Sequence, residues 1–459
     1  MLSSIALVMA LAAGSSDDGA ARTLRLDYFH TASASEEHYA RDGLVIEGPW
    51  AGNPGRPIDD TNLGKYLFEV IDRATNRSLY SRGFASICGE WESTDESKRA
   101  LRTFHESLRF PEPTGPVQVV LKKRGADGLF HEAWSVAVDP GDPTLDRTSP
   151  PPGRVWAVVE SGPPREKVDL LLLGDGYTAA EMGKWHADAK RLTELLFSVS
   201  PFKERKADFN VWALDTPSEE SGVARPSDGV HRRSALRATY DAFGSERYVL
   251  DFDNKRVREA AAAVPYDVME IVVNGRKYGG GGIFNLYATV ASDNAFTPYV
   301  FVHEFGHHFA GLADEYYTSD VAYGSSTERP EPWELNVTAD PASPKWKDLV
   351  TAGTPLPTPW AKEAFEAAQK DIQARRRKIR AEKRPEEEME ALFREEQTKM
   401  DALLGEGAYA KTVGAFEGAM YEARGYYRAQ ANCIMFTRHT EFCRVCRRAI
   451  ERIIDLYAR

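Results

Sequence analysis

Residues 301–308 read Phe-Val-His-Glu-Phe-Gly-His-His and contain the arrangement His303-Glu304-x-x-His307. An α-helix has 3.6 residues per turn, so side chains four positions apart lie on one face. Two imidazoles on that face can hold one metal ion, and a glutamate next to the first can act on a water bound to the ion. The stretch therefore predicts a helix that carries a zinc hydrolase centre, with His303 and His307 as ligands and Glu304 as the catalytic base.

The following residues, 308–317, read His-Phe-Ala-Gly-Leu-Ala-Asp-Glu-Tyr-Tyr and offer a third ligand. Gly311 suits the left-handed conformation that ends a helix and turns the backbone. The turn could return Asp314 to the metal, and a catalytic zinc typically has three protein ligands and one open position for water. Glu315 is the rival third ligand. The alternative is an ordinary loop with solvated acids.

The stretch from residue 303 to 317 resembles the active site of the bacterial immunoglobulin-A peptidase family, secreted zinc endopeptidases related to the metzincins. The resemblance covers most of the chain from about Val168 onward and extends through residues 171–178, 218–222, 433–435 and 443–446. It implies a zinc-bound catalytic domain behind an N-terminal β-rich domain. It also implies that Met435 lies in the turn that underlies the metal in metzincins.

The spacing departs from the usual metzincin pattern by one residue. That pattern places its glycine three and its third ligand six residues after the second histidine, whereas Gly311 and Asp314 lie four and seven after His307. Taking His308 as the ligand would restore the count, but a separation of five turns it about 140° away from His303. We therefore keep His307 as the ligand and expect His308 to pack or to form a hydrogen bond nearby.

Composition agrees with an enzyme of two or three domains. The chain has 459 residues, of which 42% are hydrophobic and 11% aromatic, enough for sizeable cores. The net charge of −11 argues against a nucleic-acid partner, because phosphate binding needs a basic surface. Neither composition nor motif indicates an oligomeric state.

The N-terminus predicts export. Residues 5–14 form a short apolar run that ends in small residues, as in a secretory signal, so residues 1–20 are assigned as a signal peptide. No Lys or Arg precedes the run, so a misplaced start or a disordered N-terminus is the alternative. No other stretch approaches the ~18 apolar residues of a membrane helix. We expect a secreted or periplasmic protein without stable membrane insertion.

Two domains follow. Residues 23–139 contain short alternating runs at 23–29, 67–71, 117–121 and 134–138, which predict an antiparallel β-sandwich. The Pro-rich residues 140–154 are assigned as a linker. Residues 155–459 are assigned to the catalytic domain, of metzincin-like α+β or α/β class, with strands at 168–174, 209–215 and 267–273 and a helix at 179–198.

Two further segments of this domain are distinctive. Residues 360–404 are rich in charge and are broken by Pro385, so we expect an insertion of two long polar helices. The four glycines at 279–282 lack the Gly-Lys-Ser/Thr of a phosphate loop, so nucleotide binding is rejected. Residues 283–290 are the candidate for a strand along the cleft edge, where a peptide could pair with it. A flexible surface hairpin is equally compatible.

Cys433, Cys443 and Cys446 cluster near the C-terminus. Export favours a disulfide from Cys433 to Cys443 or Cys446. Because His439 lies between them, Cys433, His439, Cys443 and Cys446 could instead bind a structural zinc.

The sequence thus predicts a secreted zinc-dependent endopeptidase that acts on a protein or peptide, with Zn²⁺ as cofactor. Glu304 would take the proton of the attacking water and pass it to the leaving amine. Two alternatives remain: an inactive zinc-containing binding or adhesion module, and an aminopeptidase-type enzyme with a downstream glutamate ligand. Glu363 and Glu366 are candidates for that glutamate. Hydroxyl donors to the oxyanion could come from Tyr316, Tyr317, Tyr426 or Tyr427.

Overall fold

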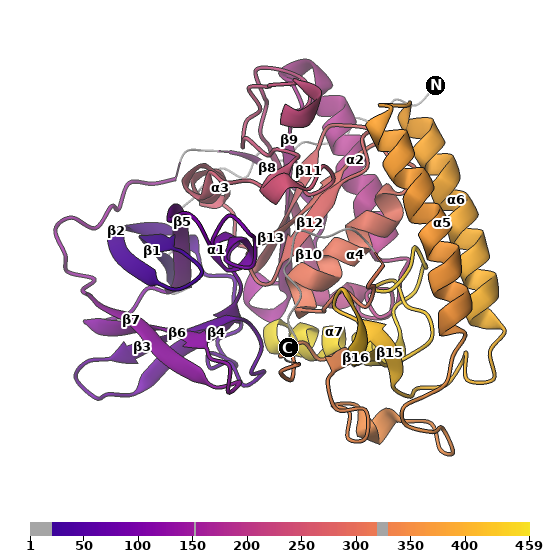
Figure 1. Cartoon of the computed structure of the whole chain (residues 1–459). Coiled ribbons are helices and arrows are strands. Elements are labelled where there is room, and N and C mark those ends of the chain that lie inside the picture. Colours follow the sequence, from indigo (N-terminus) through magenta and orange to yellow (C-terminus); the bar gives the residue numbers. More distant parts are fainter. Residues whose placement is uncertain (1–20, 151–152, 319–328) are drawn as a thin grey trace.

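The computed structural model describes residues 21–150, 153–318 and 329–459 (Figure 1). The predicted signal peptide and residues 151–152 of the predicted linker lie outside these ranges. The protein is mixed α/β, with antiparallel sheets in the N-terminal part and a mixed sheet in the C-terminal part. This agrees with the fold class predicted from the sequence at that level.

The N-terminal part consists of two antiparallel sheets around one apolar core. The first has the order β2-β1-β5 and the second β4-β3-β6-β7. The bounds are β1 Arg22–Ala32, β2 Glu37–Pro49, β3 Tyr66–Asp72, β4 Ser78–Phe84, β5 Arg102–Pro111, β6 Val117–Arg124 and β7 Phe130–Val138. Side chains from both sheets, such as Leu26 and Phe110 of one and Phe68 and Val119 of the other, share this core. Alternating side chains along the strands produce the packing, because successive residues point to opposite faces.

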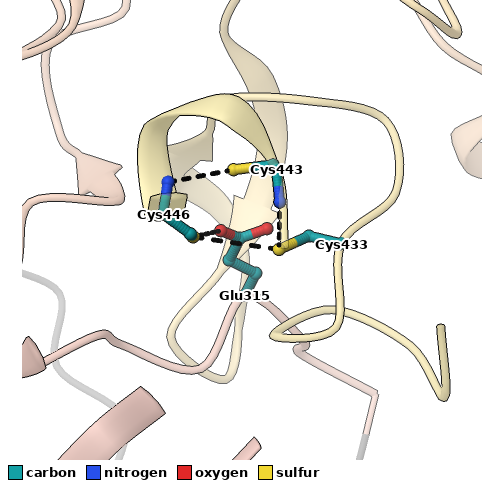
Figure 2. A group of neighbouring side chains, drawn as sticks. All are labelled: Glu315, Cys433, Cys443 and Cys446. Carbon is teal, nitrogen blue, oxygen red and sulfur yellow. Dashed lines mark hydrogen bonds between the residues drawn. The ribbon is translucent and has the colours of Figure 1, made fainter. Parts of the chain in front are cut away.

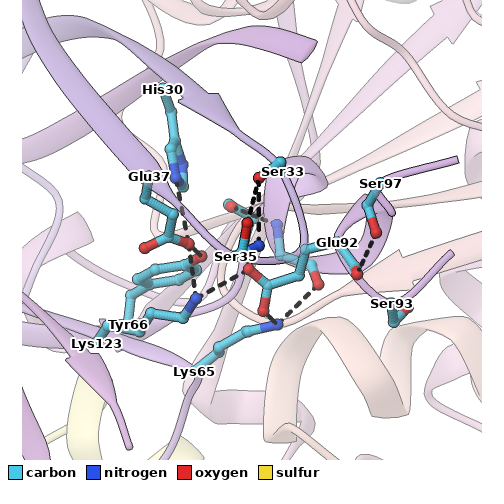
Figure 3. A network of polar contacts seen from close by, with 12 residues as sticks. His30, Ser33, Ser35, Glu37, Lys65, Tyr66, Glu92, Ser93, Ser97 and Lys123 are labelled. Atoms are coloured by element: carbon cyan, nitrogen blue, oxygen red, sulfur yellow. Dashed lines mark hydrogen bonds and ion pairs between the residues drawn. The ribbon is translucent and has the colours of Figure 1, made fainter. Parts of the chain in front are cut away.

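Polar side chains at the edge of this core are paired (Figure 3). Lys123 Nζ lies 2.7 Å from Glu37 and 2.9 Å from Glu92. The hydroxyl of Tyr66 donates to Glu37 at 3.1 Å, and Lys65 forms an ion pair with Glu92. Each partly buried acid therefore has a cationic partner, as burial of a charge requires.

The segment predicted as a linker runs along the N-terminal sheets. Leu145 belongs to their core, and Ile46 N–H donates to the carbonyl of Asp146 at 2.8 Å. The chain enters the second part with β8 (Arg154–Val159), which pairs with β10 (Phe209–Asp215).

A six-stranded sheet organises the C-terminal part, in the order β12-β13-β11-β9-β10-β8. Strands β9 (Val168–Asp175), β10, β11 (Val268–Val273) and β13 (Tyr287–Ala291) are parallel. The edge strands β8 and β12 (Gly280–Ile283) are antiparallel to their neighbours. Every residue of β9 and β11 is buried, as expected for parallel strands covered on both faces.

Helices cover this sheet. Helix α2 (Met182–Leu196) contacts α4 (Thr297–Ala310), and α4 lies against β12 and β13. Figure 1 shows the N-terminal part on the other side of the sheet, with α1 (Ile87–Trp91) and α3 (Asn254–Ala261) near the junction. The C-terminal helix α7 (Arg444–Tyr457) packs on α4.

The charged segment forms an antiparallel helical pair, α5 (Lys362–Ala381) and α6 (Glu386–Gly405), at the far right of Figure 1. Pro385 occupies the N-cap position of α6. Arg375 pairs with Glu395, and Arg380 with Glu386, which neutralises charge within the pair. A small antiparallel sheet, β14-β16-β15, lies next to this pair, with bounds β14 Val337–Thr338, β15 Phe416–Ala419 and β16 Glu422–Arg428.

The two parts of the chain are joined by a continuous apolar core. Ile87, Cys88 and Trp91 of α1 belong to the same buried cluster as the strands and helices of the C-terminal part. Ala85 N–H also donates to the carbonyl of Phe284 at 2.9 Å. The N-terminal part is therefore held next to the segment that follows β12. No helix in the described ranges is both long and apolar enough to cross a membrane.

Candidate active site

Helix α4 carries the histidine motif and ends at Gly311, whose φ of 57° is left-handed. A Cβ at this position would lie 2.6 Å from the ring of Trp333, so both the conformation and the space require glycine. The N–H groups of Gly311 and Leu312 donate back to the carbonyls of His307 and Gly306. This turn reverses the chain after α4.

The reversal brings Asp314 to the two motif histidines. His303 Nε2 and His307 Nε2 lie 3.1 and 3.2 Å from Asp314 Oδ1, and 3.1 Å from each other. Nitrogen and oxygen ligands at about 2.0–2.1 Å around a tetrahedral zinc would be about 3.3 Å apart. Asp314 Oδ1 is buried and has no hydrogen-bond partner among the described residues. The three atoms therefore fit one metal ion.

Backbone carbonyls orient both imidazoles. His303 Nδ1 donates to the carbonyl of Ile434 at 2.9 Å, and His307 Nδ1 donates to that of Leu312 at 2.5 Å. In the neutral form of each imidazole, these bonds fix the tautomer that leaves the Nε2 lone pair facing Asp314. The ligand geometry is thus built into the fold.

The electrostatics also favour a cation at this point. Burial lowers the pKa of His307. The Asp314 and Glu304 carboxylates raise it by more than burial lowers it, so the net pKa is about 9. Burial raises the pKa of Asp314, yet the two histidines hold it well below its usual value. Asp314 is therefore ionised at neutral pH and stabilises positive charge beside it.

Glu304 lines the same cleft, next to the glycines of β12. A Cβ at Gly280 would lie 3.1 Å from Glu304 Cγ, and one at Gly282 would lie 2.3 Å from the Glu304 carbonyl oxygen. The glycine run therefore lets the strand approach α4. The edge strand is β12, Gly280–Ile283, whereas the predicted 283–290 covers only the end of β12, the following turn and most of β13, which lies inside the sheet.

The cleft has a volume of about 420 Å³ and is bounded by both parts of the chain. Lys65, Gly89 and Glu90 of the N-terminal part line it together with the histidines and Glu304. A bound substrate would touch both parts.

Of the four tyrosines proposed as hydroxyl donors, the structure brings only Tyr316 to this cleft. Its ring stacks on His303 at 6.2 Å, and its hydroxyl accepts from Arg247 at 3.2 Å. Tyr317 donates to Glu366, and Tyr426 donates to the carbonyl of Pro330. Tyr427 lies on β16, where it pairs with β14 and β15.

Two residues in the cleft, Arg247 and Tyr421, had no sequence signal. The hydroxyl of Tyr421 donates to Asp314 Oδ2, the oxygen that faces away from the histidines. Tyr421 has a φ of 62°, unusual for a residue with a side chain. It lies more than a hundred residues from Asp314 in the chain, so no local pattern could have indicated the contact.

Met435 is fully buried beneath α4. A Cβ at Gly306, between the two ligand histidines, would lie 3.2 Å from Met435 Sδ. The Met435 carbonyl accepts from Glu315 N–H at 2.8 Å. Met435 therefore packs against the segment of α4 that lies between His303 and His307.

His308 points away from the cleft. Its Nδ1 donates to the Ile283 carbonyl at 3.0 Å and its Nε2 accepts from Met269 N–H at 3.2 Å. Burial lowers its pKa to about 4, so it is neutral. Both nitrogens are engaged, and neither is available to a metal at Asp314.

Glu315 belongs to a different cluster, with Cys433, Cys443 and Cys446 (Figure 2). All four side chains are buried. The disulfide favoured from the sequence is not present: the cysteines are free thiols, and Cys433 Sγ and Cys446 Sγ are 3.8 Å apart. A disulfide bond is about 2.05 Å long.

His439 does not join the cysteines, as the zinc alternative required. Its Nδ1 instead lies 3.1 Å from Asp401 in a half-buried position. The loop from Cys433 to Cys443 turns the histidine outward. Glu315 is the fourth side chain beside the three cysteines.

The glutamates of the aminopeptidase alternative are not near the histidines. Glu363 is exposed at the start of α5. Glu366, on the same helix, accepts a hydrogen bond from the Tyr317 hydroxyl. Neither lines the cleft.

Comparison with known proteins completes the description of the site. Among curated proteins, no sequence matches the chain significantly. The sequence model described as Peptidase M64 N-terminus matches residues 16–135. The model described as IgA Peptidase M64 matches residues 156–454, which include His303, His307 and Asp314. The chain therefore belongs to the IgA peptidase M64 family and is a metallopeptidase that hydrolyses peptide bonds.

Proposed function

We propose that the chain is a zinc-dependent endopeptidase whose metal is held by His303, His307 and Asp314. The observation that carries this is the convergence of three ligand atoms within 3.2 Å of one another. Two imidazole nitrogens and one carboxylate oxygen, with a cleft on the fourth side, match the donor set of a catalytic zinc. When bound, zinc would acidify a water and polarise the scissile carbonyl.

Glu304 is the proton carrier in this proposal. It lies one residue after the first ligand and lines the cleft, so its carboxylate can accept the proton of the attacking water. It then returns that proton to the amine that leaves. Tyr316, with Arg247 donating to its hydroxyl, is the candidate to bind the oxyanion.

Strand β12 offers a place for an extended substrate. Gly280 uses its outward N–H and C=O to bond Arg247 and Val249. Alternate residues of a strand point their backbone groups to the same side, so those of Gly282, which lines the cleft, point to the same outer edge as those of Gly280. An extended peptide could pair there. Such pairing along a peptide supports cleavage of internal peptide bonds.

We also propose that the site is metzincin-like and that the protein is exported. The position of Met435 beneath the ligand helix supports the first statement. The apolar run at residues 5–14 supports the second. Export is tested by comparing the molecular mass of the protein in the secreted and cytoplasmic fractions of expressing cells. A chain that stayed in the cells and kept its N-terminus would contradict export.

The test of the endopeptidase proposal uses peptides of mixed sequence with blocked N-termini, which an aminopeptidase cannot cleave. We expect the wild type to cut them. Glu304→Gln should keep zinc and lose activity by at least about 10²–10⁴-fold, the usual contribution of a general base. Glu363→Gln, an exposed change on α5, is the control and should keep full activity.

Three outcomes would contradict the proposal. Activity only on free N-termini would favour the aminopeptidase alternative, as would loss of activity in Glu363→Gln. An active Glu304→Gln enzyme would exclude Glu304 as the base. If the protein retained zinc but cleaved no peptide or protein substrate, the zinc-containing binding module would be the remaining alternative.

A further inference from the structure

Beyond this proposed function, we propose that the chain holds a second, structural zinc, bound by Cys433, Cys443, Cys446 and Glu315. Their ligand atoms all lie within 4.8 Å of one another in a buried site (Figure 2). Three sulfurs and one carboxylate oxygen are donors that zinc accepts in closed, four-coordinate sites.

The distances fit one tetrahedral ion. Two thiolates at about 2.3 Å from a tetrahedral zinc are about 3.8 Å apart, and a thiolate and a carboxylate oxygen are about 3.6 Å apart. Cys433 Sγ and Cys446 Sγ are 3.8 Å apart, and Cys446 Sγ and Glu315 Oε1 are 3.3 Å apart. An iron–sulfur cluster has several irons and bridging sulfides between the cysteines and needs a wider site.

The surroundings suit thiolates. Cys433 Sγ accepts from the N–H groups of Cys443 at 3.2 Å and Met435 at 3.5 Å. Cys443 occupies the N-cap of α7, and its Sγ accepts from Cys446 N–H at 3.4 Å. Backbone donors and a helix N-terminus favour the ionised form of a thiol.

Glu315 is a buried acid that is only partly satisfied by the protein. It is fully buried, and its Oε1 accepts from Asn336 at 3.0 Å. Its Oε2 has no hydrogen-bond partner among the residues that the structure describes. A buried carboxylate oxygen without a partner is costly, and coordination to zinc would satisfy its lone pair.

A buried cation also balances part of the charge of the proposed site. Zinc with three thiolates and one carboxylate carries a net charge of −2. Arg428 is fully buried and experiences the charges of Glu315, Cys433 and Cys443, so its guanidinium offsets part of this. Without the cation, the same pocket would bury an acid among three sulfurs.

The second site would brace the first. Glu315 follows the ligand Asp314, and Cys433 precedes Ile434, whose carbonyl orients His303. A zinc at the cysteines would therefore fix two segments that hold the proposed catalytic metal. It acts as a positioning element and touches no substrate.

The test measures zinc per chain by elemental analysis and the thiolate-to-cobalt absorption after cobalt substitution. We expect two zinc ions in the wild type. His303→Ala combined with His307→Ala should leave one ion with an unchanged thiolate band. Cys446→Ser and Glu315→Gln should lose or weaken that band, while Cys88→Ser, a buried cysteine outside the cluster, should keep it.

The histidine double variant makes the test independent of whether the cysteine variants fold. If it holds no metal, or if the intact protein is lighter by two hydrogens because Cys433 and Cys446 are joined, the second site is refuted. If the wild type holds a single thiolate-bound ion that survives the histidine changes, the second site stands and the proposed catalytic zinc fails.

Discussion

Gly282→Ala should disable the enzyme without replacing any proposed ligand. The new Cβ would lie 2.3 Å from the carbonyl oxygen of Glu304 and 2.9 Å from His307 Cβ. Real Cβ contacts keep at least about 3.0–3.4 Å, so β12 and α4 must separate by roughly 0.7–1.1 Å. The oxygen belongs to the helix backbone and cannot rotate away.

A displacement near 1 Å at a catalytic centre costs about 10²-fold in rate. That corresponds to about 2.7 kcal/mol of transition-state stabilisation. Forcing a methyl group into a packed contact also costs about 1–3 kcal/mol of folding free energy. We therefore expect kcat/KM to fall by about 10²-fold and the melting temperature to fall as well.

The assay compares peptide cleavage, zinc content and thermal unfolding with those of Gly275→Ala. Gly275 lies shortly before β12, and a Cβ there would meet only Tyr240 Oη, at 3.9 Å. This control should behave as the wild type. If Gly282→Ala retained full activity and stability, the close contact between β12 and α4 would not determine the geometry of the site.

Two further predictions concern the hydrogen bonds of buried acids. Tyr421→Phe removes the donor to Asp314 Oδ2 and should weaken zinc binding by about 10–100-fold, measured by competition with a chelator; unchanged affinity would exclude a role in holding Asp314. His30→Asn should lower the free energy of unfolding by about 3–5 kcal/mol, because it removes the cation that lies 3.1 Å from buried Glu106, whereas exposed His38→Asn should have little effect. Burial lowers the pKa of His30, but Glu106, together with hydrogen bonds to Cys88 and Glu37, raises it more, to about 12, above the unfolded value of about 6.5. The stabilisation is therefore complete below about pH 6.5 and is lost as the pH rises through 12, so the gap in melting temperature between wild type and His30→Asn should narrow from pH 6 to pH 10. A gap that widened over this range would contradict the assignment.

The N-terminal part is more than a neighbour of the catalytic part. Lys65, Gly89 and Glu90 form a wall of the cleft, and α1 shares the apolar core of the C-terminal part. The catalytic part is thus expected to depend on the N-terminal part for its stability. Because its residues line the cleft, the N-terminal part is also expected to influence which substrates bind there.

Local pattern determined several elements of the structure in advance. The runs that became β9, β10 and β11 are mostly apolar, as is typical of parallel strands buried on both faces. Strand β2 was not predicted, because most of its first residues are charged or exposed. The short strands β14 and β15 carry too few residues for any periodic signal.

The sequence by itself determined the helix with His303, Glu304 and His307, since a spacing of four sets the common face without reference to the rest of the chain. It also indicated Gly311 as the end of that helix, because a left-handed residue is a local requirement. These features depend on neighbours within one or two turns.

Only the tertiary structure decided how the adjacent acids Asp314 and Glu315 are divided between two clusters. Asp314 meets the histidines, while Glu315 meets three cysteines that lie more than a hundred residues away. Tyr421 and Ile434 reach the site over similar separations. Such contacts depend on how β12, α4 and α7 pack against one another, and that packing arises from the whole core and not from any local pattern.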